Sequence, residues 1–298
     1  ARGGGILNSA KKMSLTSEKE LYDSSAKRLE DVMQMGTGAI EIKSGYGLNL
    51  ENELKILRVI QQLKQKYSLP IKSTFLGAHA LPNEYKNNKQ GYIDLIINEM
   101  LPQIAEEQLA EYIDIFCEEG YFTVDDTEKL LEAAQDYGLI PKTHVNQFTI
   151  QGGVKASVKY NALSVDHLEI MNNEDIEVLK DSDCMPTLLP SCSFFLGIPY
   201  GPARKLIEND LPVALASDYN PGSSPSGNMN FIASLACIKM NMTPEEVINA
   251  TTINTAYAMG LSHELGSISV GKKANLFISK PITSYAFIPY SFGHQHID

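Results

Sequence analysis

The sequence of 298 residues is 43% apolar and 20% charged, a composition that is typical of a globular protein and excludes a disordered or fibrous one. Its net charge of −11 comes without any long basic cluster, so we expect no nucleic acid partner. The four cysteines lack C-x-x-C spacing and no apolar run approaches the roughly 18 residues of a membrane span, so we expect a cytoplasmic protein without a membrane partner.

Short apolar runs rich in β-branched residues alternate with segments of helical periodicity. The runs predicted as strands are residues 39–43, 71–76, 113–117, 140–145, 162–168, 184–189 and 212–217. A helix is predicted over Glu51–Lys66, because its leucines and isoleucine recur at three-residue steps on one face. Apolar strands joined by helices form a parallel sheet, which closes into a barrel at about eight strands. We therefore predict an α/β fold, a TIM-like (β/α)8 barrel that lacks its first strand.

Two further helices are expected after the seventh strand, over residues 230–240 and 244–259. The segment Gly266–Lys280 then predicts two short strands joined by a Gly-Lys turn. A β-ribbon that follows a barrel has no place within it, so we assign it to the remnant of a small β-sandwich domain. The expected domains are a barrel over residues 1–265 and part of a small β domain over residues 266–298.

Polar residues follow several of the predicted strands, at the end where an α/β barrel forms its active site. Singly, each histidine or aspartate at such a position is more often a structural residue. Together, His144, His167 and Asp218 come at the ends of the fourth, fifth and seventh runs, whereas chance would scatter them over helices and loops. Histidine nitrogen and carboxylate oxygen are ligands of catalytic zinc or iron, so the pattern predicts a shared metal site.

The motifs around these residues resemble those of a known family. The segments IEIKSGYGL, STFLGAHALPNEYK, SVDHLE, LLPSCSFFL and ASDYNPGSSPS are similar to those of the imidazolonepropionase family, within the amidohydrolase superfamily. The resemblance covers essentially the whole chain. It implies a metal-dependent hydrolase that opens the cyclic amide C–N bond of 4-imidazolone-5-propanoate, giving N-formimidoyl-L-glutamate in histidine catabolism. The implied partner is this small anionic substrate, and by analogy the family also allows a homodimer.

The resemblance also implies roles for individual residues. His144 and Asp218 match ligands of one divalent metal, zinc or iron, and His167 matches a histidine beside the water that the metal binds. Asp218 and His167 are then the catalytic residues, moving protons and stabilising the developing oxyanion. The substrate-binding residues implied are Tyr46, His79, Gln147, Asn220, Gly222 and Ser223.

This sequence departs from the family pattern at two points. No residues match the His-x-His pair of the first strand or the nearby substrate arginine, and both ends of the chain look cut, with Ala1 in place of Met. Gln147 stands where many members carry glutamate, and an amide cannot act as a base. A site with only two protein ligands is half-coordinated, so we expect this chain as given to bind metal poorly.

Two other functions remain open from the sequence. One is another amidohydrolase, a cyclic amidase or a deaminase, although the motifs at Tyr46 and His79 argue against it. The other is a catalytically silent barrel fragment, for which the unmatched metal ligands are the best argument. Cys192 has no histidine or asparagine placed to support a thiol mechanism, so we expect it to be buried by packing.

Overall fold

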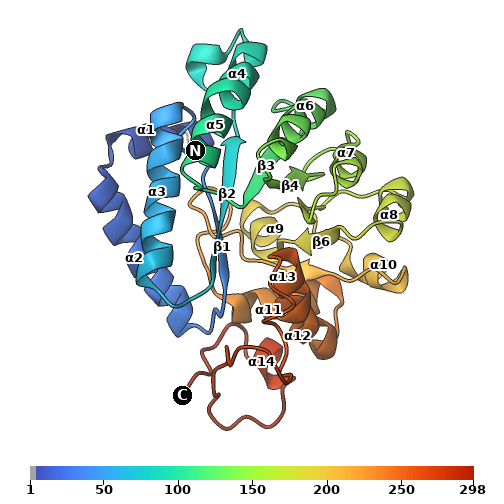
Figure 1. The fold of residues 1–298 in the computed structure, drawn as a ribbon. Coiled ribbons are helices and arrows are strands. Elements are labelled where there is room, and N and C mark those ends of the chain that lie inside the picture. Colours follow the sequence, from blue (N-terminus) through green and yellow to red (C-terminus); the bar gives the residue numbers. More distant parts are fainter. Residues whose placement is uncertain (1–4) are drawn as a thin grey trace. The chain divides into compact units, whose positions relative to one another are not determined.

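The computed structural model describes residues 5–298 and contains the seven strands expected from the sequence (Figure 1). Each predicted run overlaps its strand, and the fourth coincides with it. Ala1, on which the expectation of a cut N-terminus partly rests, lies outside the described residues. The strands are β1 Ile40–Lys43, β2 Ile71–Ala78, β3 Tyr112–Cys117, β4 Ile140–Val145, β5 Ser164–His167, β6 Met185–Leu188 and β7 Ala214–Leu215.

The chain divides into two units. Unit 1 comprises residues 1–28, 39–145 and 149–162, and unit 2 comprises residues 29–38, 146–148 and 163–298. In unit 1, β1 to β4 pair in chain order, and every pair is parallel. In unit 2, β5, β6 and β7 also pair in order and in parallel. Parallel neighbours need a crossover connection, which the intervening helices supply, so both units have the predicted α/β organisation.

The helices of unit 1 cover its sheet. They are α1 Ile6–Leu15, α3 Leu50–Lys66, α4 Lys89–Leu95, α5 Leu101–Glu106, α6 Val124–Gln135 and α7 Gly153–Lys159, with the short helices η1 Asn83–Tyr85 and η2 Ile96–Met100. Helix α2, Glu18–Gln34, begins in unit 1 and ends in unit 2. Helix α3 confirms the periodicity read from the sequence, since Leu57, Ile60 and Leu63 are buried and the Asn49 side chain caps its first turn.

Unit 2 contains the remaining helices, α8 Asn173–Lys180, α9 Pro190–Leu196, α10 Ala203–Glu208, α11 Met229–Met240, α12 Pro244–Thr251, α13 Ile253–Ala258 and α14 Phe287–Tyr290. The single helix predicted over residues 244–259 is divided in two at Thr252, which leaves the helical region with φ −122° and ψ −88°. Three consecutive β-branched residues, Thr251 to Ile253, disfavour a helix at this point, and the Thr252 hydroxyl donates to the Ile248 carbonyl at 2.6 Å.

The predicted strands of Gly266–Lys280 are not formed. This segment takes part only in an isolated antiparallel bridge between Ser279 and Ile297, and Ile268 and Val270 are almost fully exposed. A two-stranded ribbon that packs against no apolar surface is only marginally stable in water. The β propensity of this segment therefore did not suffice to predict strands. The assignment of residues 266–298 to a small β domain remains a prediction.

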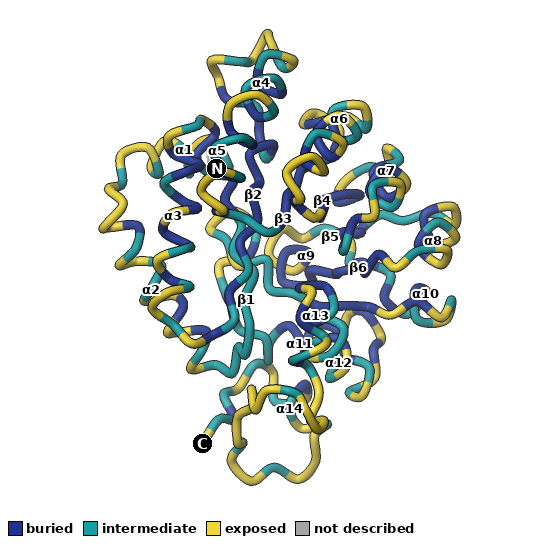
Figure 2. Tube along the Cα trace, in the orientation of Figure 1, coloured by how far each residue is buried: buried dark blue, intermediate teal, exposed yellow. Residues whose placement is uncertain are grey.

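Burial follows the sheets in each unit. Most residues of β2 to β7 are dark in Figure 2, β1 is half-buried, and exposed residues lie on the outer faces of the helices and in the loops. Phe75 and Ile113 in unit 1, and Val165 and Leu188 in unit 2, are completely buried. Strands covered on both faces explain why the sequence shows apolar runs rather than alternation. Within residues 5–298, every helix is too short or too polar to cross a membrane.

Candidate active site

The loop that carries Tyr46 is held by a buried carboxylate. Glu53, in the first turn of α3, has no exposed surface and accepts hydrogen bonds from the backbone N–H groups of Gly45 at 3.1 Å, Gly47 at 2.6 Å and Leu48 at 3.0 Å. Gly47 is required by close approach, because a Cβ there would lie 2.4 Å from the Glu53 nitrogen. Glu53 therefore fixes the loop after β1. The sequence did not reveal this residue, although an acid in a helical first turn after a glycine-rich loop is a recognisable signal.

Three of the predicted residues come together at the ends of β1, β2 and β4 in unit 1. The Tyr46 and His79 rings meet edge to face at 5.2 Å between centroids, and the His79 and His144 rings lie 6.1 Å apart. Nδ1 of His79 is 3.0 Å from the Gly45 carbonyl oxygen, which orients the ring. These strand ends therefore bring a phenol and two imidazoles into one cluster, groups able to bind a small polar ring or an anion.

His144 is held by Asp114 from the neighbouring strand β3. The backbone N–H of His144 donates to Oδ1 of Asp114 at 3.1 Å, and Nδ1 of its ring lies 2.8 Å from Oδ2. Asp114 is completely buried. A carboxylate at Nδ1 turns Nε2 of the ring to the opposite side, which is the arrangement that commonly supports a metal-binding histidine. Sequence reasoning missed Asp114.

A row of alternating charges continues from Asp114 across the sheet of unit 1. Lys43 lies 2.8 Å from Asp114 and 2.7 Å from Glu41, and Lys142 lies 2.8 Å from the other oxygen of Glu41. Lys142 is only 2% exposed. Burial alone would raise the pKa of Glu41, but the two lysines outweigh it and lower that pKa to about 2. Burial opposes ionisation of Asp114 as well, yet His144 and Lys43 hold its pKa well below the ordinary range.

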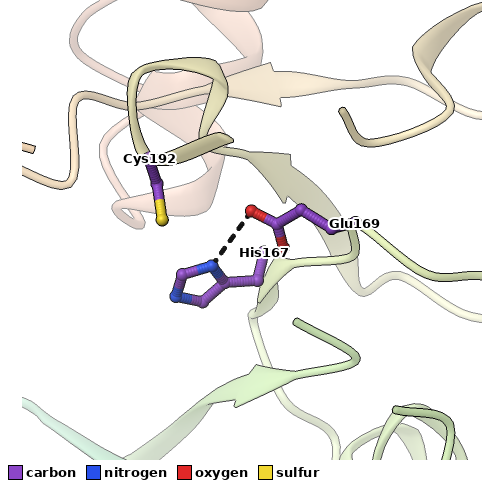
Figure 3. A group of neighbouring side chains, drawn as sticks. All are labelled: His167, Glu169 and Cys192. Carbon is purple, nitrogen blue, oxygen red and sulfur yellow. Dashed lines mark hydrogen bonds and ion pairs between the residues drawn. The ribbon is translucent and has the colours of Figure 1, made fainter. Parts of the chain in front are cut away.

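In unit 2, His167 lies against Glu169 and near Cys192 (Figure 3). Nδ1 of His167 is 3.3 Å from Oε1 of Glu169, and the Ser193 hydroxyl donates to the same oxygen at 3.4 Å. Cys192 is completely buried, as expected, and accepts a hydrogen bond from Nε2 of Gln147 at 3.4 Å. Burial raises the pKa of the Cys192 thiol, which keeps it neutral and unsuited to nucleophilic attack.

The charge of His167 is set by its neighbours in unit 2. Burial lowers the pKa of His167, but the carboxylate of Glu169, hydrogen bonds to Cys192 and Glu169, and the negative charge of Asp218 together hold that pKa well above its ordinary value. These neighbours therefore favour the positively charged form of the ring. Such a group is suited to donate a proton or to stabilise negative charge.

Asp218 lies at the start of a tightly bonded loop after β7. Its Oδ2 accepts a hydrogen bond from the Ser223 hydroxyl at 2.9 Å, while Asn220 Nδ2 donates to the Asp218 backbone oxygen at 2.7 Å. Oδ1 of Asn220 accepts from the backbone N–H groups of Gly222 and Ser223. Asn220 and Ser223 thus hold the loop and orient the Asp218 carboxylate, and their implied contacts with substrate remain a prediction.

The predicted site residues fall into two groups. Unit 1 holds Tyr46, His79 and His144, and unit 2 holds Gln147, His167, Asp218, Asn220, Gly222 and Ser223. The donor types suit a divalent metal, since unit 1 contributes an imidazole at His144, supported by Asp114, and unit 2 contributes a carboxylate at Asp218, supported by Ser223. In unit 2, His167, Glu169 and Cys192 also offer nitrogen, oxygen and sulfur atoms within 4.8 Å of one another.

Comparison with known proteins agrees with the chemistry of these residues. The profile of the amidohydrolase family matches residues 122–293. An imidazolonepropionase from Flavobacterium johnsoniae is 65% identical over 297 residues, which cover 100% of this chain and 72% of that relative. One from Alkaliphilus oremlandii is 46% identical over 298 residues, covering 100% of this chain and 70% of the relative.

Solved structures of low sequence identity share the fold. An adenosine deaminase from Xanthomonas campestris with bound zinc matches with a TM-score of 0.71 at 13% identity, covering 94% of this chain and 67% of that one. A guanine deaminase from C. acetobutylicum matches with a TM-score of 0.67 at 13% identity, over 87% and 67% of the two chains. These matches confirm an amidohydrolase-type α/β fold, and the relatives define the family more narrowly. The chain belongs to the imidazolonepropionase family of metal-dependent amidohydrolases.

Proposed function

We propose that this chain binds 4-imidazolone-5-propanoate and hydrolyses it to N-formimidoyl-L-glutamate. Water adds to the amide carbon of the ring, the C–N bond to that carbon breaks, and the released nitrogen takes up a proton. The observation that carries the proposal is the 65% identity to an imidazolonepropionase over the full chain, together with a Tyr46–His79–His144 cluster able to hold a small anionic ring.

His144 and Asp218 are the residues that would hold one zinc or iron ion. Bound there, a divalent cation would supply Lewis acidity towards the ring carbonyl and towards water. Asp114 holds the His144 ring through Nδ1, and Ser223 holds the Asp218 carboxylate through Oδ2. We infer that the chain's own contribution is to pre-orient these two donors.

Asp218 and His167 carry the proton transfers. The Asp218 carboxylate accepts the proton of the attacking water, and the protonated His167 ring stabilises the developing oxyanion and delivers a proton to the departing nitrogen. Gln147 cannot act as a base, and its amide is engaged with Cys192. Tyr46 and His79 bind the substrate by hydrogen bonds and hold its ring in place.

The test is hydrolysis of imidazolone propionate by metal-loaded protein expressed from the complete gene, followed by NMR detection of formimidoylglutamate. We expect turnover in the parent and a loss of about 10²–10⁴-fold in kcat in Asp218→Asn, which keeps the shape but removes the base. A panel of cyclic amides and aminated rings separates this function from that of another cyclic amidase or a deaminase. Turnover of a different ring, or none of any ring, would exclude the proposal.

A further inference from the structure

The burial of the Glu169 carboxylate in unit 2 is energetically unfavourable. Its side chain is 1% exposed, and within residues 5–298 its Oε2 has no hydrogen-bond partner. Leaving a buried carboxylate oxygen without a hydrogen-bond partner is unfavourable, because the oxygen loses its hydration and gains no replacement. Folding alone does not require this, because a glutamine or an apolar side chain would fill the same space without the charge. A buried, incompletely satisfied charge calls for a functional explanation.

The backbone that presents Glu169 is strained. His167 and Leu168 both have positive φ, 87° and 63°, which is uncommon and unfavourable for residues other than glycine. This turn ends β5 and brings the carboxylate of residue 169 back against the ring of residue 167 (Figure 3). Two strained residues and one unsatisfied carboxylate therefore serve a single contact, that between Oε1 of Glu169 and Nδ1 of His167.

We propose that Glu169 is the positioning residue for His167: it holds the Nδ1–H group, fixes the ring orientation and directs Nε2 to the reacting substrate. The proposal rests on the proposed function, in which His167 delivers a proton. In Figure 3 the second ring nitrogen lies on the side of the ring away from the Glu169 carboxylate. Without a charged acceptor at Nδ1, the ring can flip about its side-chain bonds, and Nε2 then no longer faces the substrate.

The neighbours of the pair support this assignment. The hydroxyl of Ser193, the residue after Cys192 in α9, donates a hydrogen bond to Oε1 and helps to hold the carboxylate in place. The negative charge of Glu169 also helps to keep the His167 pKa raised. Glu169 acts through His167 and does not itself need to touch the substrate.

The test is Glu169→Gln, which preserves shape and removes charge, with Glu177→Gln on the exposed side of α8 as the matched control. Ring nitrogen NMR of 15N-histidine-labelled protein reports the protonation and tautomer of His167, identified by its absence in His167→Gln. We expect Glu169→Gln to lower the pKa of His167 and to populate the Nε2–H tautomer. In the metal-loaded enzyme we expect kcat to fall about 10–100-fold with KM changed by less than about twofold.

Several outcomes distinguish a positioning role of Glu169 from a purely structural or metal-binding role. Unchanged His167 ring signals in Glu169→Gln would overturn it, as would equal effects in Glu177→Gln. A rival role for His167, Glu169 and Cys192 is to bind a metal ion together, and cobalt added to metal-free protein tests it. A thiolate-to-cobalt absorption band that disappears in Cys192→Ser would overturn the proposal that Glu169 positions His167. If the parent does not hydrolyse imidazolone propionate but the ring signals still shift, the proposed function fails while the positioning role stands. If Glu169→Gln does not fold, Ser193→Ala, which removes a hydrogen bond to Oε1, must still shift the His167 ring signals.

Discussion

At the scale of single residues, the chemistry-bearing side chains could be predicted and their supporting partners could not. His144, His167 and Asp218 were visible because each ends a strand and has the right chemical type. Asp114 and Glu169 were not visible in the sequence. Each acid acts through a contact with a histidine, across the sheet for Asp114 and after a strained turn for Glu169, and the sequence does not show such contacts. A signal for Asp114 did exist: a lone charge in the apolar run YIDIFC must be paired once buried.

Replacing Asp114 with asparagine tests its support of His144. We expect the affinity for zinc to fall by about 10–100-fold, because the amide no longer provides a charged acceptor at Nδ1 of the ring. Chelator competition on the protein from the complete gene measures this directly. Asp94→Asn, which removes a half-exposed ion pair with Lys129, is the control and should bind zinc normally. Equal affinity in both variants would show that Asp114 has no part in metal binding.

At the scale of elements, the strands and the first long helix were predictable because their apolar patterns have clear periods. The single helix over residues 244–259 and the two strands over residues 266–280 were predicted wrongly, since both depend on what the rest of the chain offers as packing partners. The loop between β1 and α3 was noted only for Tyr46. Its conformation depends on Glu53, six residues beyond Gly47, and no local turn motif includes that contact.

Replacing Glu53 with glutamine tests whether this loop positions Tyr46. One carboxylate accepts three backbone N–H groups, and hydrogen bonds to a charged group contribute about 1.5–3 kcal/mol each. We expect lower stability in urea denaturation and a higher KM, with kcat affected less, because the loop binds substrate and does not transfer protons. Glu51→Gln, on the exposed side of the same helical turn, should change neither quantity. An unchanged KM in Glu53→Gln would remove the loop from substrate binding.

At the scale of the whole molecule, the response to acid should depend on the buried charges more than on the net charge of −11. The pKa of Glu41 is lowered from 4.5 to about 2. A lowered carboxyl pKa stabilises the folded state fully above 4.5, and that stabilisation is lost as the pH falls from 4.5 towards about 2. Surface pairs such as Arg58–Glu107 contribute far less, because water screens them.

Glu41→Gln should therefore destabilise the protein by about 3–5 kcal/mol at neutral pH, because it leaves Lys142 buried without its carboxylate. The difference in free energy of unfolding between Glu41→Gln and the parent should shrink as the pH drops below about 4.5, because Glu41 of the parent then loses its charge as well. Denaturant unfolding across a pH series measures both effects. Glu107→Gln is the surface control, with an expected loss of no more than about 1 kcal/mol. A stability difference that is independent of pH would contradict the lowered pKa of Glu41.

The charge row in unit 1 also constrains how this protein can diverge. Glu41, Lys43, Asp114 and Lys142 comprise two acids and two bases, so their formal charges cancel. Replacing Glu41 alone leaves Lys142 buried without its carboxylate, whereas exchanging the set for apolar side chains of similar volume can be nearly neutral for stability. Natural sequences change one substitution at a time, so replacing this set of charges requires passing through variants of lower stability. These four positions should accordingly be inherited together, and engineering them demands simultaneous rather than stepwise change.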